Sequence, residues 1–491
     1  MDQDETPIIS ALADYHRKDR YGFTPPGHRQ GRGAAETALD VLGKDTYRSD
    51  VLASAGLDDR SSYNGYLQKA QELMADAVGA QHAFFSTCGS SLSVKAAILA
   101  VTRGTGELLV GRDAHKSVTA GLILSGLQPR WISPSWDDEL HLAHPPSPEA
   151  VEAMWQRHPD AAAAVIVSPT PYGTCADIQA IAEICHQRGK PLIIDEAWGA
   201  HLPFHEGLPT WAMDAGADIC VVSVHKMGTG FEQGSVYHLQ GGLVDPVRLR
   251  QCADLLSTTS SSVIMYAGID AWRHQMAQHG RRLLDDALNL ATDLRSRIDA
   301  FTGIHVLEDE LIGAEASHDL DRLHVLMDVK ELGISGYQAA DWLRTNCTID
   351  VGLNDHRRIE ATLSTADDES SAQRLMESLQ ALCSAAKDLP RPSEVRLPHS
   401  SDLEMKTVKL PRDAFFGPVE VVPVEEAAGR VAAEQITPYP PGVPAILPGE
   451  RINAAVLEYL VSGKEAGMVL PDPADPSLKT IRVVPERPEA S

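Results

Sequence analysis

The segment Ser223-Val-His225-Lys226-Met-Gly228-Thr229-Gly230 decides how the rest of this chain is interpreted. It directly follows the apolar run Ile219-Cys-Val-Val222, which is typical of a buried strand. A lysine at the end of such a strand can be held out of water, and burial then lowers its pKa and frees the amine to attack a carbonyl. The alternative is a solvated lysine that happens to follow a strand.

Length and composition indicate a large, acidic, intracellular protein. With 491 residues, the chain exceeds one ordinary core, so we expect two or three domains. A hydrophobic content of 43% and a charged content of 23% are typical of soluble globular proteins. The net charge of −25 argues against nucleic acid and anionic membranes as partners.

Targeting signals and cysteine spacing also predict a cytoplasmic protein. No apolar run is long enough to span a bilayer, and the N-terminus Met1-Asp-Gln-Asp-Glu5 is too acidic to begin a signal peptide. The seven cysteines are scattered, and none forms a CxxC pair. This pattern favours a reducing compartment and predicts neither a disulfide framework nor a metal site.

Apolar strands alternate with helices over the first half of the chain. The predicted strands are 83–87, 107–112, 161–168, 191–198 and 219–224. Such alternation predicts a parallel sheet buried on both faces, which binds ligands at the carboxyl ends of its strands. The polar segments at those ends are 89–91, 115, 170–172, 195–201 and 223–226.

Three of these segments together match the needs of pyridoxal phosphate. This cofactor requires a lysine, a carboxylate that keeps its ring nitrogen protonated, and a cradle for its phosphate. Asp195 lies 31 residues before Lys226, which is one crossover in a parallel sheet. The turn Gly89-Ser90-Ser91 precedes a predicted helix and can bind an anion, although the two serines can equally be plain helix caps.

The chain resembles the Orn/Lys/Arg decarboxylase family, in its short form without an N-terminal wing domain. The stretches that carry this resemblance are 26–31, 112–117, 195–201 and 223–226, with 439–444 and 448–450 similar to the family's C-terminal domain. The resemblance implies an α/β fold of the aspartate-aminotransferase type (fold type I) with a mainly parallel sheet. We expect an N-terminal arm over 1–33, a cofactor-binding domain over 34–280, a small α+β domain over 281–388 and a C-terminal domain over 400–491.

The resemblance also implies roles for individual residues. Lys226 would form the Schiff base with pyridoxal phosphate, Asp195 would pair with the pyridine nitrogen, and His115 would stack on the ring. His225 would be the fourth catalytic residue. The other cofactor contacts that the resemblance implies are Gly89, Ser90, Ser91, Ala197, Trp198, Ser223, Thr259 and Ser260. Because Thr259 and Ser260 resemble a segment that reaches a neighbouring subunit's cofactor, we expect a homodimer or a higher homo-oligomer.

The implied activity is α-decarboxylation of arginine, lysine or ornithine to the amine and CO₂, a reaction of polyamine biosynthesis. The candidates for binding the substrate are His28, Glu232 and Glu450. The tail Met227-Gly-Thr-Gly-Phe-Glu232 departs from the family's apolar run, which leaves the choice of substrate open.

Two other functions remain open at this point. Transamination, aldol cleavage or oxidative deamination can run on the same scaffold, because fold does not fix reaction type. Aminotransferases of this fold use a small-domain arginine, and Arg344, Arg357 and Arg358 are available. A catalytically silent regulatory homologue is the second alternative, which the presence of Lys226 disfavours.

Overall fold

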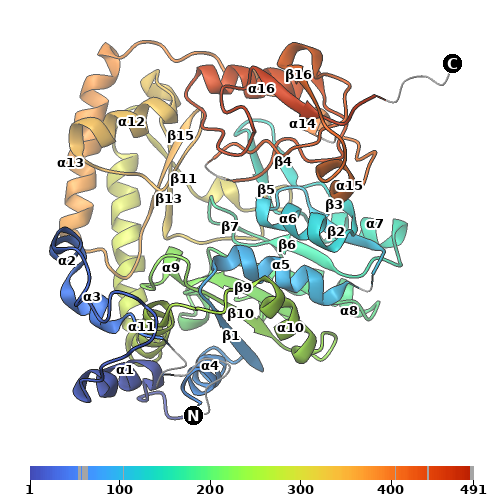
Figure 1. Ribbon diagram of the computed structural model, residues 1–491. Coiled ribbons are helices and arrows are strands. Elements are labelled where there is room, and N and C mark those ends of the chain that lie inside the picture. The colour runs from blue at the N-terminus through green and yellow to red at the C-terminus, as the bar shows by residue number, and fades with distance from the viewer. Residues whose placement is uncertain (53–56, 58–64, 103, 404, 440–441, 487–491) are drawn as a thin grey trace. The chain divides into compact units, whose positions relative to one another are not determined.

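The computed structural model describes the chain except residues 53–56, 58–64, 103, 404, 440–441 and 487–491 (Figure 1). Two residues of the predicted C-terminal motif, Pro440 and Pro441, therefore lie outside the described residues. The chain divides into two compact units. The first comprises Met1–Ala100 and Pro191–Leu284, and the second comprises Val101–Lys190 and Asp285–Ser491. The four domain boundaries predicted from the sequence stay predictions.

The sheet of the first unit carries the segment around Lys226. Its strands lie in the order β1 (His82–Ser86), β10 (Ser235–Leu239), β9 (Ile219–Ser223) and β8 (Leu192–Asp195). All residues of β8, β9 and β10 are buried, which explains their almost uninterrupted apolar sequence. Strand β8 runs parallel to β9, with Asp195 opposite Val221. This confirms the predicted single crossover between the strand of Asp195 and the strand before Lys226.

Several helices belong to the first unit. They are α1 (Pro7–Arg17), α2 (Glu36–Leu42), α3 (Lys44–Ser49), α4 (Tyr66–Ala77), α5 (Gly89–Val101), α9 (Val224–Met227), α10 (Pro246–Leu256) and the part of α11 (Val263–Asp299) up to Leu284. The spacing of apolar residues predicts a long helix from Arg282 to Phe301, at the place where the structure has α11. It begins at Val263, because Ile269, Trp272 and Met276 form a buried stripe at helical spacing directly after the hydroxyl-rich loop.

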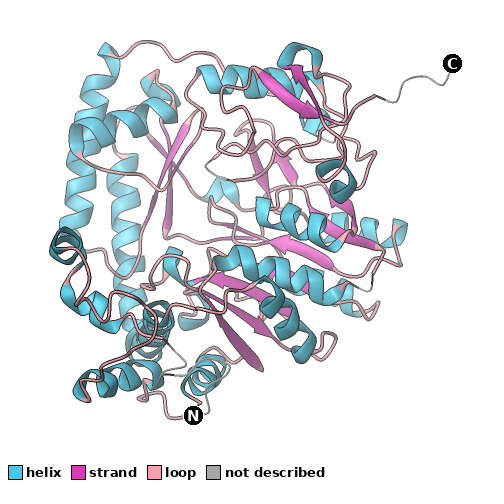
Figure 2. Ribbon diagram, viewed as in Figure 1, coloured by secondary structure: helices cyan, strands magenta, loops and turns pink. Residues whose placement is uncertain are grey.

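The second unit contains a group of three parallel strands and a separate antiparallel sheet (Figure 2). The parallel strands are β6 (Ala164–Val167), β2 (Glu107–Gly111) and β3 (Gln128–Ile132). The antiparallel strands are β11 (His305–Leu307), β13 (His324–Asp328), β15 (Arg358–Thr362) and β14 (Leu353–Asn354). Further short strands are β4 (Ser135–Asp137), β5 (Leu142–His144), β7 (Thr174–Cys175) and β12 (Asp319–Leu320). The helices are α6 (Lys116–Ser125), α7 (Pro148–Arg157), α8 (Ile178–His186), α12 (Gly336–Cys347) and α13 (Glu369–Ala385).

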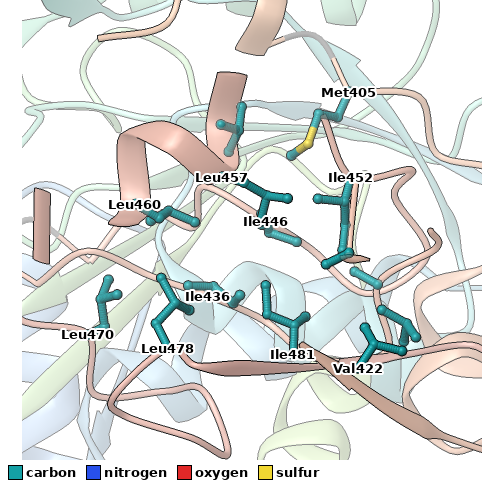
Figure 3. Close-up of a cluster of buried hydrophobic side chains, with 14 of the residues drawn as sticks. Met405, Val422, Ile436, Ile446, Ile452, Leu457, Leu460, Leu470, Leu478 and Ile481 are labelled. Atoms are coloured by element: carbon teal, nitrogen blue, oxygen red, sulfur yellow. The ribbon is translucent and has the colours of Figure 1, made fainter. Parts of the chain in front are cut away.

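The C-terminal part of the second unit has a hydrophobic core of its own (Figure 3). Its elements are α14 (Ser400–Leu403), α15 (Pro411–Phe415), β16 (Glu420–Pro423), α16 (Ala454–Glu465) and β17 (Thr480–Val483). Ile436, Ile446 and Ile481 are completely buried in this core, together with Leu460 from α16. The segment is therefore a packed body that can hold other side chains in place. Among the described residues, no helix combines the length and the apolar character that a membrane crossing requires.

Candidate active site

Lys226 lies in the one-turn helix α9, directly after the buried strand β9. Its side chain is only partly exposed, and its Nζ lies 4.1 Å from the centre of the Trp198 ring. Burial lowers the pKa of Lys226 to about 8, although the negative charge of Asp195 acts in the opposite direction. An amine with such a pKa is partly unprotonated near neutral pH, which is the state that attacks a carbonyl.

Asp195 ends strand β8 and is buried. Burial raises its pKa to about 6, against the opposing effects of Lys226 and of a hydrogen bond from the Ala197 backbone N–H. Within the described part of the chain, Asp195 Oδ1 has no hydrogen-bond partner, and neither has Oγ of the buried Ser223. Buried polar atoms without partners cost free energy, so both atoms are suited to a ligand that supplies the missing bonds.

His225 is oriented by the loop before β10. Its Nδ1 lies 3.1 Å from the carbonyl oxygen of Gly234, which can only accept a hydrogen bond. Nδ1 therefore carries the proton, and in the neutral ring Nε2 keeps its lone pair. Burial lowers the pKa of His225 below its ordinary value, so the ring is neutral at pH 7 and can accept a proton.

The Gly89-Ser90-Ser91 turn forms the start of helix α5. Gly89 has a φ of +73°, and its N–H donates to the carbonyl of Gln233 at 2.9 Å. Ser93 and Ser235 are joined through their hydroxyl groups at 3.1 Å, which fixes α5 against β10. A Cβ added to Gly89 would meet no atom within 4 Å, so there is open space beside this helix N-terminus. Such a terminus presents N–H groups without intrahelical partners and can hold a phosphate.

Four further residues predicted for the site lie in peripheral loops of the first unit. Thr259 and Ser260 are exposed, and Ser260 makes its hydrogen bonds to Thr258 in the same loop. Glu232 is exposed, and its charge acts on His225. His28 Nε2 lies 3.1 Å from Asp50 Oδ2.

His115 and Glu450 belong to the second unit. His115 caps the N-terminus of α6, where its Nδ1 accepts a hydrogen bond from the Ser117 N–H at 3.2 Å. The imidazole lies against Gly442, at which a Cβ would come within 3.0 Å of the ring. Glu450 is completely buried, and its Oε2 accepts hydrogen bonds from Arg112 at 3.1 Å and from the Leu447 N–H at 3.0 Å.

The three small-domain arginines considered for a transaminase are already paired with carboxylates. Arg344 pairs with Asp341, and Arg357 pairs with Asp328. Arg358 is completely buried, and its Nε donates to Asp355 at 3.0 Å. All three charges are thus balanced by neighbours in the same unit.

Some polar contacts in each unit were not predicted from the sequence. Glu196, next to Asp195, is buried, and its Oε2 lies 2.9 Å from the Cys220 thiol, while burial raises its pKa well above the ordinary value. The pairs Arg112–Glu450 and Lys116–Asp472 were also missed. Their members lie 338 and 356 residues apart, and no spacing pattern connects positions at such distances.

Comparisons with known proteins identify the family. Residues 6–331 match the family model described as Orn/Lys/Arg decarboxylase, major domain, and residues 397–472 match its C-terminal domain. The chain is 36% identical to an arginine decarboxylase of Halalkalibacterium halodurans over 99% of this chain and 98% of the relative. It is 34% identical to an arginine decarboxylase of Bacillus subtilis over 99% of both chains. The structure of lysine decarboxylase A from Pseudomonas aeruginosa has a similar fold, with a TM-score of 0.80 and 21% identity over 98% of this chain and 80% of that one.

The described residues fit the cofactor of such enzymes. The unpartnered Asp195 Oδ1 suits a ring N–H, the open space at Gly89 suits a phosphate, and Lys226 offers an amine of lowered pKa. The cofactor is pyridoxal phosphate, the fold is the α/β fold of fold type I enzymes, and the reaction is decarboxylation of a basic amino acid. The chain belongs to the Orn/Lys/Arg decarboxylase family.

Proposed function

We propose that this chain decarboxylates L-arginine, with Lys226 as the residue that holds pyridoxal phosphate. The observation that carries the substrate choice is the match, over nearly the full length of both chains, to arginine decarboxylases at 34–36% identity. In the reaction the bond between Cα and the carboxyl carbon breaks, CO₂ leaves, and a proton takes its place on Cα. The amine product enters polyamine biosynthesis.

The contacts of the first unit support a division of roles among its residues. Asp195 would hold the ring nitrogen, Gly89, Ser90 and Ser91 would hold the phosphate, and Ala197, Trp198 and Ser223 would line the ring. When bound, pyridoxal phosphate supplies a protonated ring that accepts the electron pair left on Cα. The ionised Asp195 keeps that ring nitrogen protonated, because a buried carboxylate is stabilised by a neighbouring positive charge.

Two side chains can exchange protons with the substrate. The Lys226 amine has a pKa of about 8, so its protonated and unprotonated forms are both populated near neutral pH. His225 presents Nε2 as an acceptor because Nδ1 is engaged by Gly234. We propose Lys226 as the donor and His225 as the group that orients the substrate and exchanges protons with it. Efficient general acid–base catalysis calls for a pKa near the working pH, as Lys226 has.

Glu232 is the acidic residue that we propose for recognising the guanidinium of arginine. It is exposed and electrostatically coupled to His225. Glu450 already accepts a hydrogen bond from Arg112, and His28 already pairs with Asp50. Replacement of Glu232 by Gln is expected to raise KM for arginine by about tenfold, with a smaller effect on kcat. The exposed Glu331→Gln variant is the control, and an unchanged KM in Glu232→Gln would exclude this role.

We further propose a cytoplasmic homodimer with shared active sites. The exposed position of Thr259 and Ser260 supports their contact with a partner subunit's cofactor. Phe231 next to the Lys226 segment is 57% exposed, which suits an interface. Light scattering of the purified protein tests the oligomer, and a Ser260→Trp variant that still dimerises but loses cofactor would support sharing.

The function is tested with purified protein, pyridoxal phosphate and each of arginine, lysine and ornithine. We expect equal amounts of amine and CO₂ from arginine and no keto acid. The comparison of CO₂ with keto acid separates decarboxylation from transamination. If lysine or ornithine is the better substrate by kcat/KM, the proposal for arginine is wrong, while the family assignment stands.

A further inference from the structure

We propose that the turn formed by residues 231–234 positions two parts of the cofactor site at once, the phosphate cradle and the ring of His225. The inference rests on the proposed function, because it takes the Gly89-Ser90-Ser91 turn as the cradle that holds the phosphate of pyridoxal phosphate. All the contacts that carry it lie within the first unit. Gln233 and Gly234 are positioning residues, which act through Gly89 and His225.

The carbonyl group of Gly234 holds the start of helix α9 and the ring of His225. It accepts a hydrogen bond from the Val224 N–H at 2.9 Å, and His225 Nδ1 lies 3.1 Å from the same oxygen. A carbonyl oxygen has two lone pairs, and both are used here. Gly234 is buried, so these hydrogen bonds are little weakened by water. A displacement of this one oxygen would therefore move the backbone before Lys226 and release the imidazole of His225.

The carbonyl group of Gln233 holds the phosphate cradle. It accepts a hydrogen bond at 2.9 Å from the N–H of Gly89, the first residue of helix α5. The N–H groups that follow in the first turn of a helix have no intrahelical acceptor and are suited to an anion. Just after the turn, the Ser235 hydroxyl lies 3.1 Å from the hydroxyl of Ser93 on α5. The start of α5 is therefore fixed to the end of the 231–234 turn at two points.

The two carbonyl groups belong to successive peptide groups, so they cannot move independently. Because peptide groups are planar, only the φ and ψ angles of Gly234 lie between the two oxygens. Gly234 is followed at once by strand β10, whose pairing with β1 and β9 resists changes in these angles. A shift of the phosphate cradle that displaces Gln233 is therefore passed to the oxygen that holds His225.

The turn itself is held in one shape. The Gly234 N–H donates to the Phe231 carbonyl at 2.9 Å and closes the turn. Gln233, the third residue of the turn, has a φ of +72°, in the left-handed region that favours glycine. A Cβ added to Gly234 would lie 2.9 Å from the Phe231 carbonyl oxygen, so a larger residue opens the turn. A Cβ added to Gly268 of helix α11 would come within 2.8 Å of the Phe231 ring, so the turn also packs closely on this helix.

The decisive measurement is the preference of the full-length protein for the phosphate group of its cofactor. We define this phosphate preference as the Kd of pyridoxal divided by the Kd of pyridoxal phosphate, each obtained by absorbance titration of the cofactor-free protein. Pyridoxal has the same ring and aldehyde but no phosphate. A change that acts on Lys226 or on the ring contacts alters both dissociation constants, whereas a change that acts on the phosphate cradle alters their ratio.

The first comparison is between Gly234→Ala and Gly313→Ala. Gly313 is the matched control, since its φ also lies outside the left-handed region but an added Cβ would meet no atom within 4 Å. We expect the phosphate preference to fall about tenfold in Gly234→Ala, the equivalent of roughly 1.4 kcal/mol, and to stay unchanged in Gly313→Ala. A wild-type phosphate preference in Gly234→Ala would overturn the proposal.

The second comparison tests the coupling from its other end, with His225→Leu and His225→Asn. Leucine removes the donor to the Gly234 carbonyl, whereas asparagine retains an N–H group on a short side chain. We expect His225→Leu to lower the phosphate preference about threefold, in the range for the loss of one hydrogen bond, and His225→Asn to keep the wild-type value. If His225→Leu weakens the binding of both aldehydes by the same factor, His225 acts on the ring alone and the coupling is wrong. If Gly234→Ala does not fold, the two His225 variants decide the question.

Failure of the proposed function gives a different result. A wild-type protein that binds no pyridoxal phosphate would overturn the cofactor assignment and this inference with it. A wild type that binds both aldehydes equally well would show that the Gly89-Ser90-Ser91 turn does not hold the phosphate, and would also overturn both. A wild type with a strong phosphate preference that neither Gly234→Ala nor His225→Leu lowers contradicts the coupling alone and leaves the proposed function intact.

Discussion

Two regions of this molecule carry the same dipeptide, His-Lys, and use it in opposite ways. His225-Lys226 follows strand β9 in the first unit, and His115-Lys116 follows strand β2 in the second. The Lys226 amine contacts the face of Trp198, and burial lowers its pKa to about 8. The Lys116 ammonium instead pairs with Asp472 at 2.8 Å and serves as an anchor.

The comparison teaches how surroundings assign a role to identical residues. Near Lys226, buried Asp195 and Ser223 each have an atom without a hydrogen-bond partner among the described residues. Burying these atoms costs free energy of folding until a ligand supplies the missing hydrogen bonds. Near Lys116, the opposite charges of Asp472 and Glu450 face the loop. Arg112 Nε, Glu450 Oε1 and both carboxylate oxygens of Asp113 also lack a hydrogen-bond partner among the described residues. The difference between the two regions is therefore the pairing of Lys116 and Arg112 with carboxylates, which gives their charges a structural role.

The largest expected effect separates the two lysines by activity. Replacement of Lys226 by Ala is expected to lower the rate of amine formation by roughly 10²–10⁴-fold, the usual range for loss of a group that transfers protons. The exposed Lys44→Ala variant serves as the control and keeps full activity. Amine release is the measurement. If Lys226→Ala forms amine at the wild-type rate, the proposed catalytic role of Lys226 is wrong.

The next effect concerns the stability of the paired region. Replacement of Arg112 by Met leaves Glu450 buried without its cation, which is expected to lower the free energy of unfolding by about 3–5 kcal/mol. The double variant Arg112→Met/Glu450→Met should recover much of this loss, because an apolar pair costs no desolvation. Denaturant titration measures the free energy of unfolding of both variants. If Arg112→Met is as stable as the wild type, the ion pair between Arg112 and Glu450 does not stabilise the fold.

A smaller effect is expected from pH on the cofactor-free protein. Asp195 has a folded pKa of about 6, above its ordinary value of 3.8. Between these values the folded state holds a proton that the unfolded state has lost, so stability falls as pH rises. Relative to Asp195→Asn, we expect the wild type to lose about 2–3 kcal/mol between pH 4 and pH 7. If the difference in unfolding free energy between the wild type and Asp195→Asn stays constant from pH 4 to pH 7, burial does not raise the pKa of Asp195.

The smallest expected effect belongs to Lys116. Its side chain is 36% exposed, so its ion pair with Asp472 is screened by water. Replacement of Lys116 by Met is therefore expected to change the free energy of unfolding by less than about 1 kcal/mol. Thermal unfolding measures this change. A loss as large as that of Arg112→Met would place Lys116 among the residues that stabilise the fold.

Much of the first unit was predictable from local sequence. The apolar runs before Asp195 and Lys226 indicated adjacent buried strands, and the structure pairs Asp195 with Val221 in a parallel register. Local patterns also predicted that a helix follows the Gly89-Ser90-Ser91 turn, and the structure has α5 there. Each of these inferences uses residues close in sequence, where strand and helix periodicity is informative.

The contacts of the C-terminal segment were not predictable in the same way. Arg112 and Glu450 both lie in motifs that the sequence singled out, but their pairing depends on how two distant segments pack. The predicted start of helix α11 was 19 residues too late, for a related reason. The hydroxyl run before Val263 indicates a loop, and the buried stripe that follows is defined by tertiary packing around Trp272.

The most direct test of the account is to locate the cofactor on the chain. Sodium borohydride reduces the bond between a lysine amine and the pyridoxal phosphate aldehyde to a stable amine, and peptide mass spectrometry then identifies the modified residue. We predict that the label is on Lys226 and that Lys116 is unmodified. A label on Lys116 or on any other lysine, or no label in protein that forms amine from arginine, would contradict the account.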